Sequence, residues 1–431
     1  MGRMVPAAPR GAPLTDGHDP RPGRAAPTAG PVDARGGRPI MQRPAPGATR
    51  AEDQGRTGRT MRASTVGDSG RQQRADDGAP GVVGRHPAVR SGPWLLQGHD
   101  GRLIAFALVD QAVLRWTEAR PGGPVWLGPD VLPAKGLTHL TVVQGRNRYA
   151  HLLGRRARGG DERPLSVDLV YAIQYQAGRP MSEWRPVGNP HAKRERTALM
   201  GAPTAAVSTT GILHAFVPTA EGRVALRRED AKGSWEAWRD LQVAAALDTP
   251  AATALTTGQV ELAAPAPTGV LTWYQPQPGA AFERGPDLGV VPLPGSMTGV
   301  ETSPGRVTRY LTDLQRGGIV AVRAGEWPIP LGGDPGDGRH AALATTLDGY
   351  PCTVLAHRDA AGRIVLGVCV AEDERNGVWW TDTGTSCLRD PVLAHDGDGR
   401  VVVLALAPDG SLTLARQEDG PGLTLSDWTH I

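Results

Sequence analysis

Residues 203–238 read PTAAVSTTGILHAFVPTAEGRVALRREDAKGSWEAW: a small-residue strand, a turn at Gly211, an apolar strand, a turn at Gly222, an alternating strand and a terminal aromatic. Glycine adopts the positive φ that tight hairpin turns require, so each of these two glycines marks a turn between short strands. The pattern predicts a small antiparallel sheet.

The same pattern recurs along the chain at a nearly constant period. The first-turn glycines are Gly211, Gly258, Gly305, Gly349 and Gly399, with spacings of 47, 47, 44 and 50 residues. A second-turn glycine follows each of them after 11 to 13 residues. Four short strands in roughly 45–50 residues is the length of one propeller blade. We therefore predict an all-β, seven-bladed β-propeller of four-stranded blades over residues 93–431.

The proposed packing of the blades accounts for the low aromatic content of 5 %. A single four-stranded blade cannot bury both of its faces, whereas blades stacked around a ring bury each face on a neighbour. Val, Leu and Ala then supply the core, as in Val401–Leu406. The unit near residues 140–190 departs from the pattern, and its arginines at 155, 156 and 158 suggest an expanded loop. The last unit looks complete, so a strand borrowed from the first blade is possible but not required to close the ring.

The first 92 residues have a different composition from the rest of the chain. They hold no aromatic residue, 15 Arg, no Lys and 8 acidic residues, a net charge of +7, which leaves −4 for the remainder of a chain with a total of +3. Without large apolar side chains such a segment cannot offset the entropy of ordering its backbone. We predict a disordered tail over residues 1–92. Its arginines are scattered singly, which makes nucleic acid an unexpected partner.

The sequence contains no clear targeting signal and no cofactor-binding motif. No apolar run near the start resembles a signal peptide, and none is long enough for a membrane span, so the cytoplasm is the default location. The three cysteines are too few for a disulfide framework. Cys352 and Cys369 are expected on adjacent strands, nearly opposite each other, as two small buried side chains. No cysteine pair has zinc-ligand spacing, and we predict no metal and no cofactor.

Several units resemble the bacterial PLL-type lectin-like propellers, whose repeats run Asp-Gly-Arg-Leu, an apolar strand, a glycine turn and a Trp-x-x-Trp end. The matching segments are Asp100–Leu103 with Leu114–Trp116, Gly222–Val224 with Trp235–Trp238, and Asp398–Val401. The resemblance implies seven blades and binding of fucose or methylated sugars in grooves between them. Residues 246–337 lack the Trp-x-x-Trp end.

Sugar recognition needs an aromatic face for the C–H side of the ring beside charged or polar groups for the hydroxyls. Residue pairs of this kind give nine candidate ligand-binding residues: Arg115, Trp116, Arg228, Trp235, Trp238, Trp273, Tyr274, Trp380 and Asp382. The alternative interpretation is that the tryptophans pack between blades. It applies most strongly to those at the recurring blade end: Trp126, Trp184, Trp238, Trp327 and Trp428.

No catalytic motif is recognisable, because the sequence lacks a nucleophile elbow, a His-Glu-x-x-His helix and a phosphate loop. The leading hypothesis is a non-catalytic, carbohydrate-binding propeller. One alternative is an intracellular scaffold for a protein partner. The other is a propeller glycoside hydrolase with acidic residues in its central channel.

Overall fold

Short antiparallel strands form nearly all of the regular structure in the computed structural model. It describes residues 88–159, 166–242, 246 and 248–431. All of these belong to one structural unit, residues 80–431. The predicted disordered tail lies, up to residue 87, outside the described residues. The first strand begins at Ser91, two residues before the predicted start of the propeller.

The strands form seven four-stranded sheets, and each sheet uses four consecutive strands in chain order. Blade 1 holds β1(Ser91–Gln97), β2(Leu103–Val109), β3(Ala112–Glu118) and β4(Trp126–Pro133); blade 2 holds β5(Leu137–Gln144), β6(Ala150–Arg158), β7(Ser166–Gln174) and β8(Arg185–Gly188). Blade 3 holds β9(Thr204–Val207), β10(Leu213–Pro218), β11(Val224–Arg228) and β12(Arg239–Asp240); blade 4 holds β13(Ala251–Ala254), β14(Val260–Ala266), β15(Gly269–Tyr274) and β16(Glu283–Arg284). Blade 5 holds β17(Thr298–Ser303), β18(Arg306–Thr312), β19(Ile319–Val322) and β20(Ile329–Gly332); blade 6 holds β21(Ala341–Leu347), β22(Tyr350–Arg358), β23(Arg363–Val370) and β24(Trp379–Ser386). Blade 7 holds β25(Val392–His395), β26(Val401–Leu406), β27(Leu412–Arg416) and β28(Thr429–His430).

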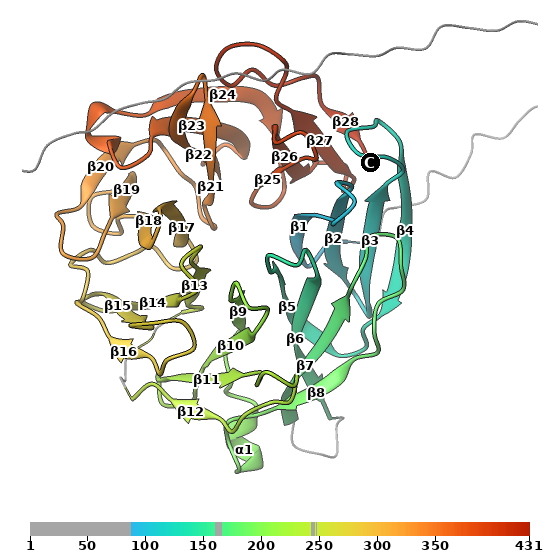
Figure 1. Cartoon of the computed structure of the whole chain (residues 1–431), viewed down its shortest axis with the longest axis vertical. Coiled ribbons are helices and arrows are strands. Elements are labelled where there is room, and N and C mark those ends of the chain that lie inside the picture. Colours follow the sequence, from blue (N-terminus) through green and yellow to red (C-terminus); the bar gives the residue numbers. More distant parts are fainter. Residues whose placement is uncertain (1–87, 160–165, 243–245, 247) are drawn as a thin grey trace, which may run out of the picture. The chain divides into compact units, whose positions relative to one another are not determined.

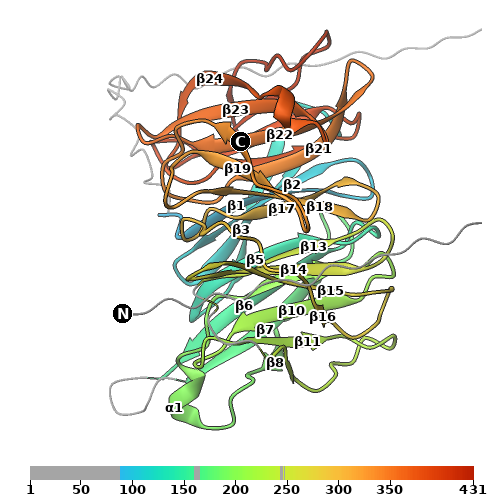
Figure 2. The same cartoon turned by 90° about the vertical axis from the view of Figure 1, so that its left-hand side faces the viewer.

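The seven sheets are arranged around a ring. The first strand of each blade contacts the first strand of the next, from β1 through β5, β9, β13, β17 and β21 to β25, and β25 contacts β1 again. Figure 1 looks down this ring, with the first strands on the inside and the fourth strands on the rim. Figure 2 shows the same strands from the side. The predicted seven-bladed propeller is confirmed. Two short helices, α1(Arg194–Thr197) and η1(Glu374–Asn376), lie in its connections.

Burial between blades explains why small and aliphatic residues suffice for this fold. Every residue of β2, with sequence LIAFALV, and of β26, with sequence VVVLAL, is buried. A strand in the middle of a blade is covered on both faces, which favours continuous apolar runs over alternation. Most of the hydrophobic clusters join two neighbouring blades, as when Phe106 of blade 1 packs with Leu152 of blade 2.

The turn glycines occupy the positions that their spacing predicts. Gly211, Gly258, Gly305, Gly349 and Gly399 all lie between the first and second strands of their blades, with φ between 77° and 100°. Since the same turn recurs at the same place in five blades, the spacing of these glycines in the sequence corresponds to the length of one blade.

The ring closes without a borrowed strand, because blade 1 and blade 7 each use four strands of their own. Leu95 and Leu103 pack against Val402 and Leu404 across the junction. Beside this cluster, the buried Glu118 pairs with Arg416 of blade 7. The same carboxylate accepts the backbone N–H of Leu103 at 2.7 Å. Apolar packing and a buried ion pair therefore seal the ring.

Blade 2 differs from its predicted form. Arg155, Arg156 and Arg158 do not lie in a loop but belong to β6, which pairs with β7 as far as Arg158. Arg155 donates to the carbonyl oxygens of Met200 and Ala198, which anchors the strand to the next connection. The strand therefore continues through residues that were predicted to lie in a loop, with the guanidinium of Arg155 bonded to carbonyl groups and that of Arg156 over the ring of Trp184.

The cysteines are buried and free, and Cys352 and Cys369 lie on adjacent strands and nearly opposite each other, as predicted, with an offset of one residue. Cys352 pairs with Val370, and Cys369 pairs with Thr353. Because successive residues of a strand point to opposite faces, this offset of one residue places the two thiols on different faces of blade 6.

Gly269 gives a stability prediction. Its φ is 152°, and a Cβ at this position would lie 2.2 Å from the carbonyl oxygen of Leu288. We expect Gly269→Ala to lower the free energy of unfolding by about 2–4 kcal/mol, since backbone strain adds to a backbone clash. Gly289→Ala is the control, because a Cβ there meets nothing within 4 Å. Urea denaturation of both variants measures the difference, and equal midpoints would contradict the clash.

Candidate functional site

Tryptophans attach the outer strands of several blades to the preceding blade. The indole N–H of Trp184 donates to the carbonyl of Pro133, and that of Trp380 donates to the carbonyl of Leu331. Trp428 packs in the cluster between blades 6 and 7. The packing interpretation is therefore confirmed for Trp184 and Trp428. Trp327 is different, because 84 % of its surface is exposed.

In blade 1 the candidates Arg115 and Trp116 lie in two different interfaces. Arg115 is buried, pairs with Asp130 at 2.5 Å and donates to the carbonyl of Arg179 in blade 2. Trp116 packs against the cluster shared with blade 7. Adjacent strand residues leave opposite faces of a blade, so the two side chains do not share a groove.

The candidate residues of blade 3 also lie in two different interfaces, one with blade 4 and one with blade 2. Arg228 pairs with Glu236 at 3.0 Å and reaches the carbonyl of Gly279 in blade 4. Trp235 faces blade 2, where it packs edge-on against Tyr171 at a centroid distance of 5.9 Å. Trp238 packs in the same cluster, and Arg227 lies over its ring at 5.7 Å.

In blade 4 one candidate is packed and the other is accessible. Trp273 is only 2 % exposed, and its indole lies under the guanidinium of Arg284 at 5.0 Å. Tyr274 is 37 % exposed and donates its hydroxyl to Glu283 at 3.3 Å. A ligand therefore has access to Tyr274 but to very little of Trp273.

In blade 6 the candidate Trp380 faces blade 5. It packs against Tyr310 and Ile329 and lies 5.2 Å from the ring of His357. Asp382 pairs with Arg363. The neighbouring Trp379, which the sequence placed in the same segment, has the opposite orientation and is 65 % exposed.

Trp379 lines a groove of about 410 Å³ between blades 6 and 7, which we call the 6/7 groove. This volume falls in the range of about 300–1,000 Å³ that is typical of small-molecule sites. Blade 6 contributes one wall, and the connection between β27 and β28 contributes the other. The lining residues are Leu366, Val368, Trp379, Thr381, Thr383, Leu423, Thr424, Leu425, Ser426, Asp427 and Trp428.

The 6/7 groove combines the chemical groups that a sugar requires. Trp379 offers an exposed aromatic surface, while Thr381 and Asp427 offer a hydroxyl and a carboxylate. Ser426 is fixed, since its hydroxyl accepts the N–H of Arg416 and donates to the carbonyl of Asp427. The second wall is therefore held in place before a ligand arrives. Sequence alternation could have found this site, because Trp379, Thr381 and Thr383 share one face of a strand.

Exposed aromatic side chains gather on one face of the ring. The loops after the first and third strands of every blade lie on the same side of a propeller, because the strands alternate in direction. The exposed aromatic residues all lie in or next to these loops: Tyr175, Tyr274, Trp327, Tyr350 and Trp379. Large exposed apolar residues of the opposite face are aliphatic, such as Leu199 and Leu388.

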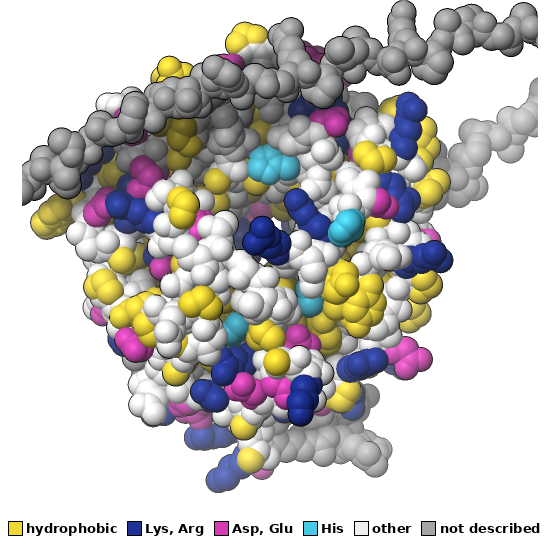
Figure 3. Space-filling model, viewed as in Figure 1, with side chains coloured by type: hydrophobic (Ala, Val, Ile, Leu, Met, Phe, Trp, Pro, Cys, Tyr) yellow, Lys and Arg dark blue, Asp and Glu magenta, His cyan; other side chains and the backbone are white. Residues whose placement is uncertain are grey.

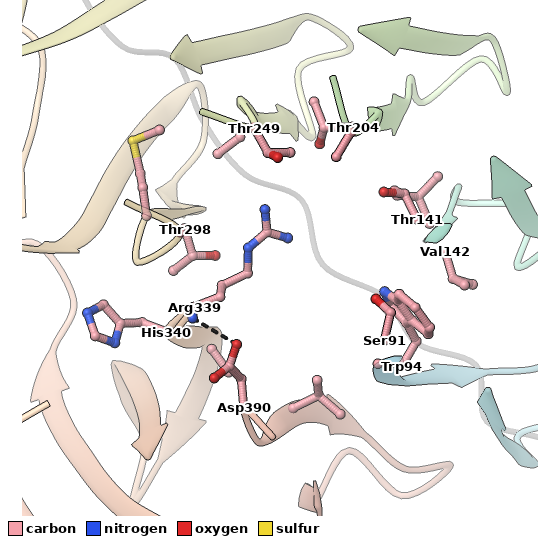
Figure 4. A pocket seen from close by; sticks show the side chains of 18 of the residues that line it. Ser91, Trp94, Thr141, Val142, Thr204, Thr249, Thr298, Arg339, His340 and Asp390 are labelled. Carbon is pink, nitrogen blue, oxygen red and sulfur yellow. Dashed lines mark hydrogen bonds between the residues drawn. The ribbon is translucent and has the colours of Figure 1, made fainter. Parts of the chain in front are cut away.

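A second cavity, of about 510 Å³, lies in the central channel at the entry to the first strands. Asp248, Arg339 and Asp390 are among its lining residues (Figure 4). Asp248 accepts the backbone N–H of Gly295, and Asp390 accepts that of Arg339 at 2.8 Å. On the face shown in Figure 3, basic side chains lie near the centre of the ring, and most of the visible acidic ones lie farther out.

Glu374 is a buried acid that lies outside both cavities. Glu374 accepts the hydroxyl of Tyr310 at 3.0 Å and pairs with Arg323, all within the interface of blades 5 and 6. Burial raises the pKa of Tyr310. Because Glu374 and Tyr310 are at most 1 % exposed, this cluster stabilises the interface and is closed to a substrate.

Two features of the described residues concern metals and membranes. No cluster of three or more His, Cys, Asp or Glu side chains in them could hold a metal ion. None of the helices in the same part of the chain is long and apolar enough to cross a bilayer.

Comparison with known proteins shows which solved structures have a similar fold. No family model and no curated protein matches the sequence. Among solved structures, the BP39L lectin from Burkholderia pseudomallei is similar with a TM-score of 0.59 and 12 % identity, covering 79 % of this chain and 98 % of that one. The SapL1 lectin in complex with alpha methyl fucoside has a TM-score of 0.44 and 11 % identity, covering 79 % and 96 %. A polysaccharide lyase of family PL25, an ulvan lyase, has a TM-score of 0.46 and 13 % identity, covering 80 % and 96 %.

Since a fold hosts many functions, an identity of 12 % carries the architecture and not the activity. What the likeness to the BP39L lectin shows is that the chain has the fold of a β-propeller.

Proposed function

We propose that this protein is a carbohydrate-binding propeller that holds a sugar in the 6/7 groove and releases it unchanged. The observation that carries the proposal is the exposed indole of Trp379 in a groove that also contains Trp428, hydroxyl groups and the carboxylate of Asp427. An aromatic ring stacks on the apolar face of a sugar, while polar groups bind its hydroxyls. The lectin fold of the BP39L protein agrees with this assignment.

The ligand class follows from the walls of the groove. Leu366 and Leu425 join Trp379 in an apolar surface, and Asp427 is the one carboxylate among the described lining residues. A sugar with an extra methyl group, such as fucose or an O-methylated hexose, presents a matching apolar edge. Glycoside hydrolysis usually requires two carboxylates at a defined separation. We therefore infer binding without turnover.

Trp379→Ala tests the site. We expect the affinity for methyl fucoside or a methylated hexose, measured by titration calorimetry, to fall about tenfold or more, since the variant removes the stacking surface. Trp327→Ala is the matched control, because Trp327 is exposed on the same face but does not line the groove. Trp380→Phe should also retain binding, since Trp380 faces blade 5.

Three outcomes would contradict the proposal. Wild-type protein that binds no monosaccharide on a glycan array would remove the carbohydrate function. Equal losses in the Trp379 and Trp327 variants would remove the site. Release of shortened products from a bound glycan would contradict binding without turnover.

A protein partner is a second candidate function, and one surface favours it. Val125, Leu127 and Val131 are 59 %, 54 % and 63 % exposed along the free edge of blade 1. A cluster of exposed apolar side chains on an edge strand is a typical protein-binding surface. Val131→Lys should release a stoichiometric partner that copurifies from the native host, and unchanged copurification would exclude this surface.

A further inference from the structure

The guanidinium of Arg339 points toward the middle of the central channel (Figure 4). Arg339 is the only Lys or Arg among the described residues that line this cavity. Its backbone N–H donates to Asp390, but within the described chain its side chain makes no hydrogen bond or ion pair. The carboxylates of Asp248 and Asp390 act on its charge from within the same lining. An arginine fork binds a carboxylate through two parallel hydrogen bonds, so this exposed guanidinium is available to an anionic ligand.

The loop before β21 fixes the base of this side chain. Arg339 N–H donates to Asp390 at 2.8 Å, and His340 N–H donates to the carbonyl of Ser296 at 3.1 Å. A Cβ on Gly338 would lie only 2.0 Å from the carboxylate of Asp390, so the loop packs tightly there. The contacts on both sides fix the backbone from which the Arg339 side chain extends into the channel, so the loop itself needs no ordering when a ligand binds.

The remaining lining of the channel suits a sugar. Trp94 is partly buried at the wall beside Ser91, across the open space from the loop that carries Arg339 (Figure 4). Several inner strands and connections contribute hydroxyl groups to the lining, namely those of Ser91, Thr141, Thr204, Thr249 and Thr298. A cavity of about 510 Å³ accommodates a monosaccharide.

The two carboxylates of the channel restrict which anion fits. Asp248 and Asp390 lie in the same lining as Arg339, and burial raises the pKa of Asp390. Their negative charge repels a dianion such as phosphate or sulfate more strongly than a monoanion such as a uronate. They also accept hydrogen bonds from hydroxyl groups. The lining is therefore complementary to a molecule with one carboxylate and several hydroxyls.

We propose that the central channel is a second ligand site, specific for a saccharide that carries a carboxylate, such as a uronic acid. Its carboxylate binds the guanidinium of Arg339, and its hydroxyls donate to Asp248 and Asp390. The sugar ring lies toward Trp94. This site does not depend on the 6/7 groove, because the two cavities share no lining residue.

Titration of the full chain with D-glucuronate, its methyl ester, D-glucose and inorganic sulfate tests the inference. We expect glucuronate to bind at least about tenfold more tightly than the uncharged ester or glucose, since hydrogen bonds to a charged group are the stronger ones. Arg339→Gln should remove that preference, and Arg339→Lys should restore part of it. Arg375→Gln is the control, because it removes the same charge from an exposed residue outside both cavities.

The outcomes separate this site from the first one. Trp379→Ala should leave glucuronate binding unchanged, and Arg339→Gln should leave methyl fucoside binding unchanged. Equal binding of glucuronate and its ester, tighter binding of sulfate, or an equal loss in the Arg375 variant would each overturn the inference. Because the Arg339 side chain is exposed and makes no hydrogen bond or ion pair within the described chain, the melting temperature of Arg339→Gln should match that of wild type.

Discussion

Arg416→Met should destabilise the closed ring by about 3–5 kcal/mol. Glu118 has a fully buried carboxylate that pairs with Arg416 across the junction of blades 1 and 7. Burial raises the pKa of Glu118, and the charge of Arg416 opposes that shift. Removal of Arg416 leaves an uncompensated buried charge, which is a strongly destabilising change. The measurement is the free energy of unfolding in urea at pH 7.5.

Two further variants make the comparison specific. Arg363 pairs with Asp359 and Asp382, but its side chain is 49 % exposed, so Arg363→Met should destabilise the protein far less than Arg416→Met. Replacing both Glu118 and Arg416 with methionine should recover part of the loss, because the unpaired carboxylate of Glu118 is then removed. The buried Asp396, which also pairs with Arg416, keeps Arg400 as its partner. Similar losses for Arg416→Met and Arg363→Met would show that the junction does not depend on the buried pair.

Acidification should destabilise the propeller between pH 6.5 and about 4. Burial lowers the pKa of His151, His214 and His357 to about 4 and that of His340 to about 3. The unfolded chain takes up these protons near pH 6.5 while the folded protein does not. Stability is therefore complete above pH 6.5 and is lost as the pH falls. At pH 5 each histidine contributes about 2 kcal/mol to the loss.

The structure supplies the reason for these shifts. Neither ring nitrogen of His357 has a hydrogen-bond partner, and the ring lies between His340 and Trp380. Protonation of the His357 imidazole would therefore add a second N–H donor and a positive charge at a buried position that has no hydrogen-bond acceptor. His357→Phe should make the dependence of the urea midpoint on pH less steep, whereas the exposed His99→Asn should leave it unchanged. Glu118, Glu229 and Asp390 have raised pKa values and act in the opposite direction, so the comparison of variants is the decisive measurement. Identical pH profiles for wild type and His357→Phe would contradict this origin.

The fold could be predicted from local signals. Turn glycines such as Gly258 and Gly305 are required wherever the backbone takes a positive φ, and their period is therefore visible without any tertiary information. The continuous apolar run of Val401–Leu406 indicated a strand buried on both faces. The N-terminal part of the chain, up to residue 87, lies outside the described residues, and its predicted disorder stays a prediction.

The candidate site was harder to predict because it depends on the direction of single side chains. Trp379 and Trp380 are adjacent, and the sequence favoured Trp380 and Asp382. The structure places Trp380 against blade 5 and Trp379 in the 6/7 groove, a difference of one residue in register. For the nine candidates that the sequence singled out, ligand binding itself stays a prediction.

The sequence alone determined the blade, since turn chemistry, strand length and apolar content are properties of contiguous residues. It also determined the number of blades, through the period and the length of the chain. Only the tertiary structure decided which side chains face a cavity, because a groove needs two blades and the channel needs all seven. Arg339 and Trp94 are 245 residues apart in the sequence, and no local pattern connects them. Closure of the ring brings them to the same cavity.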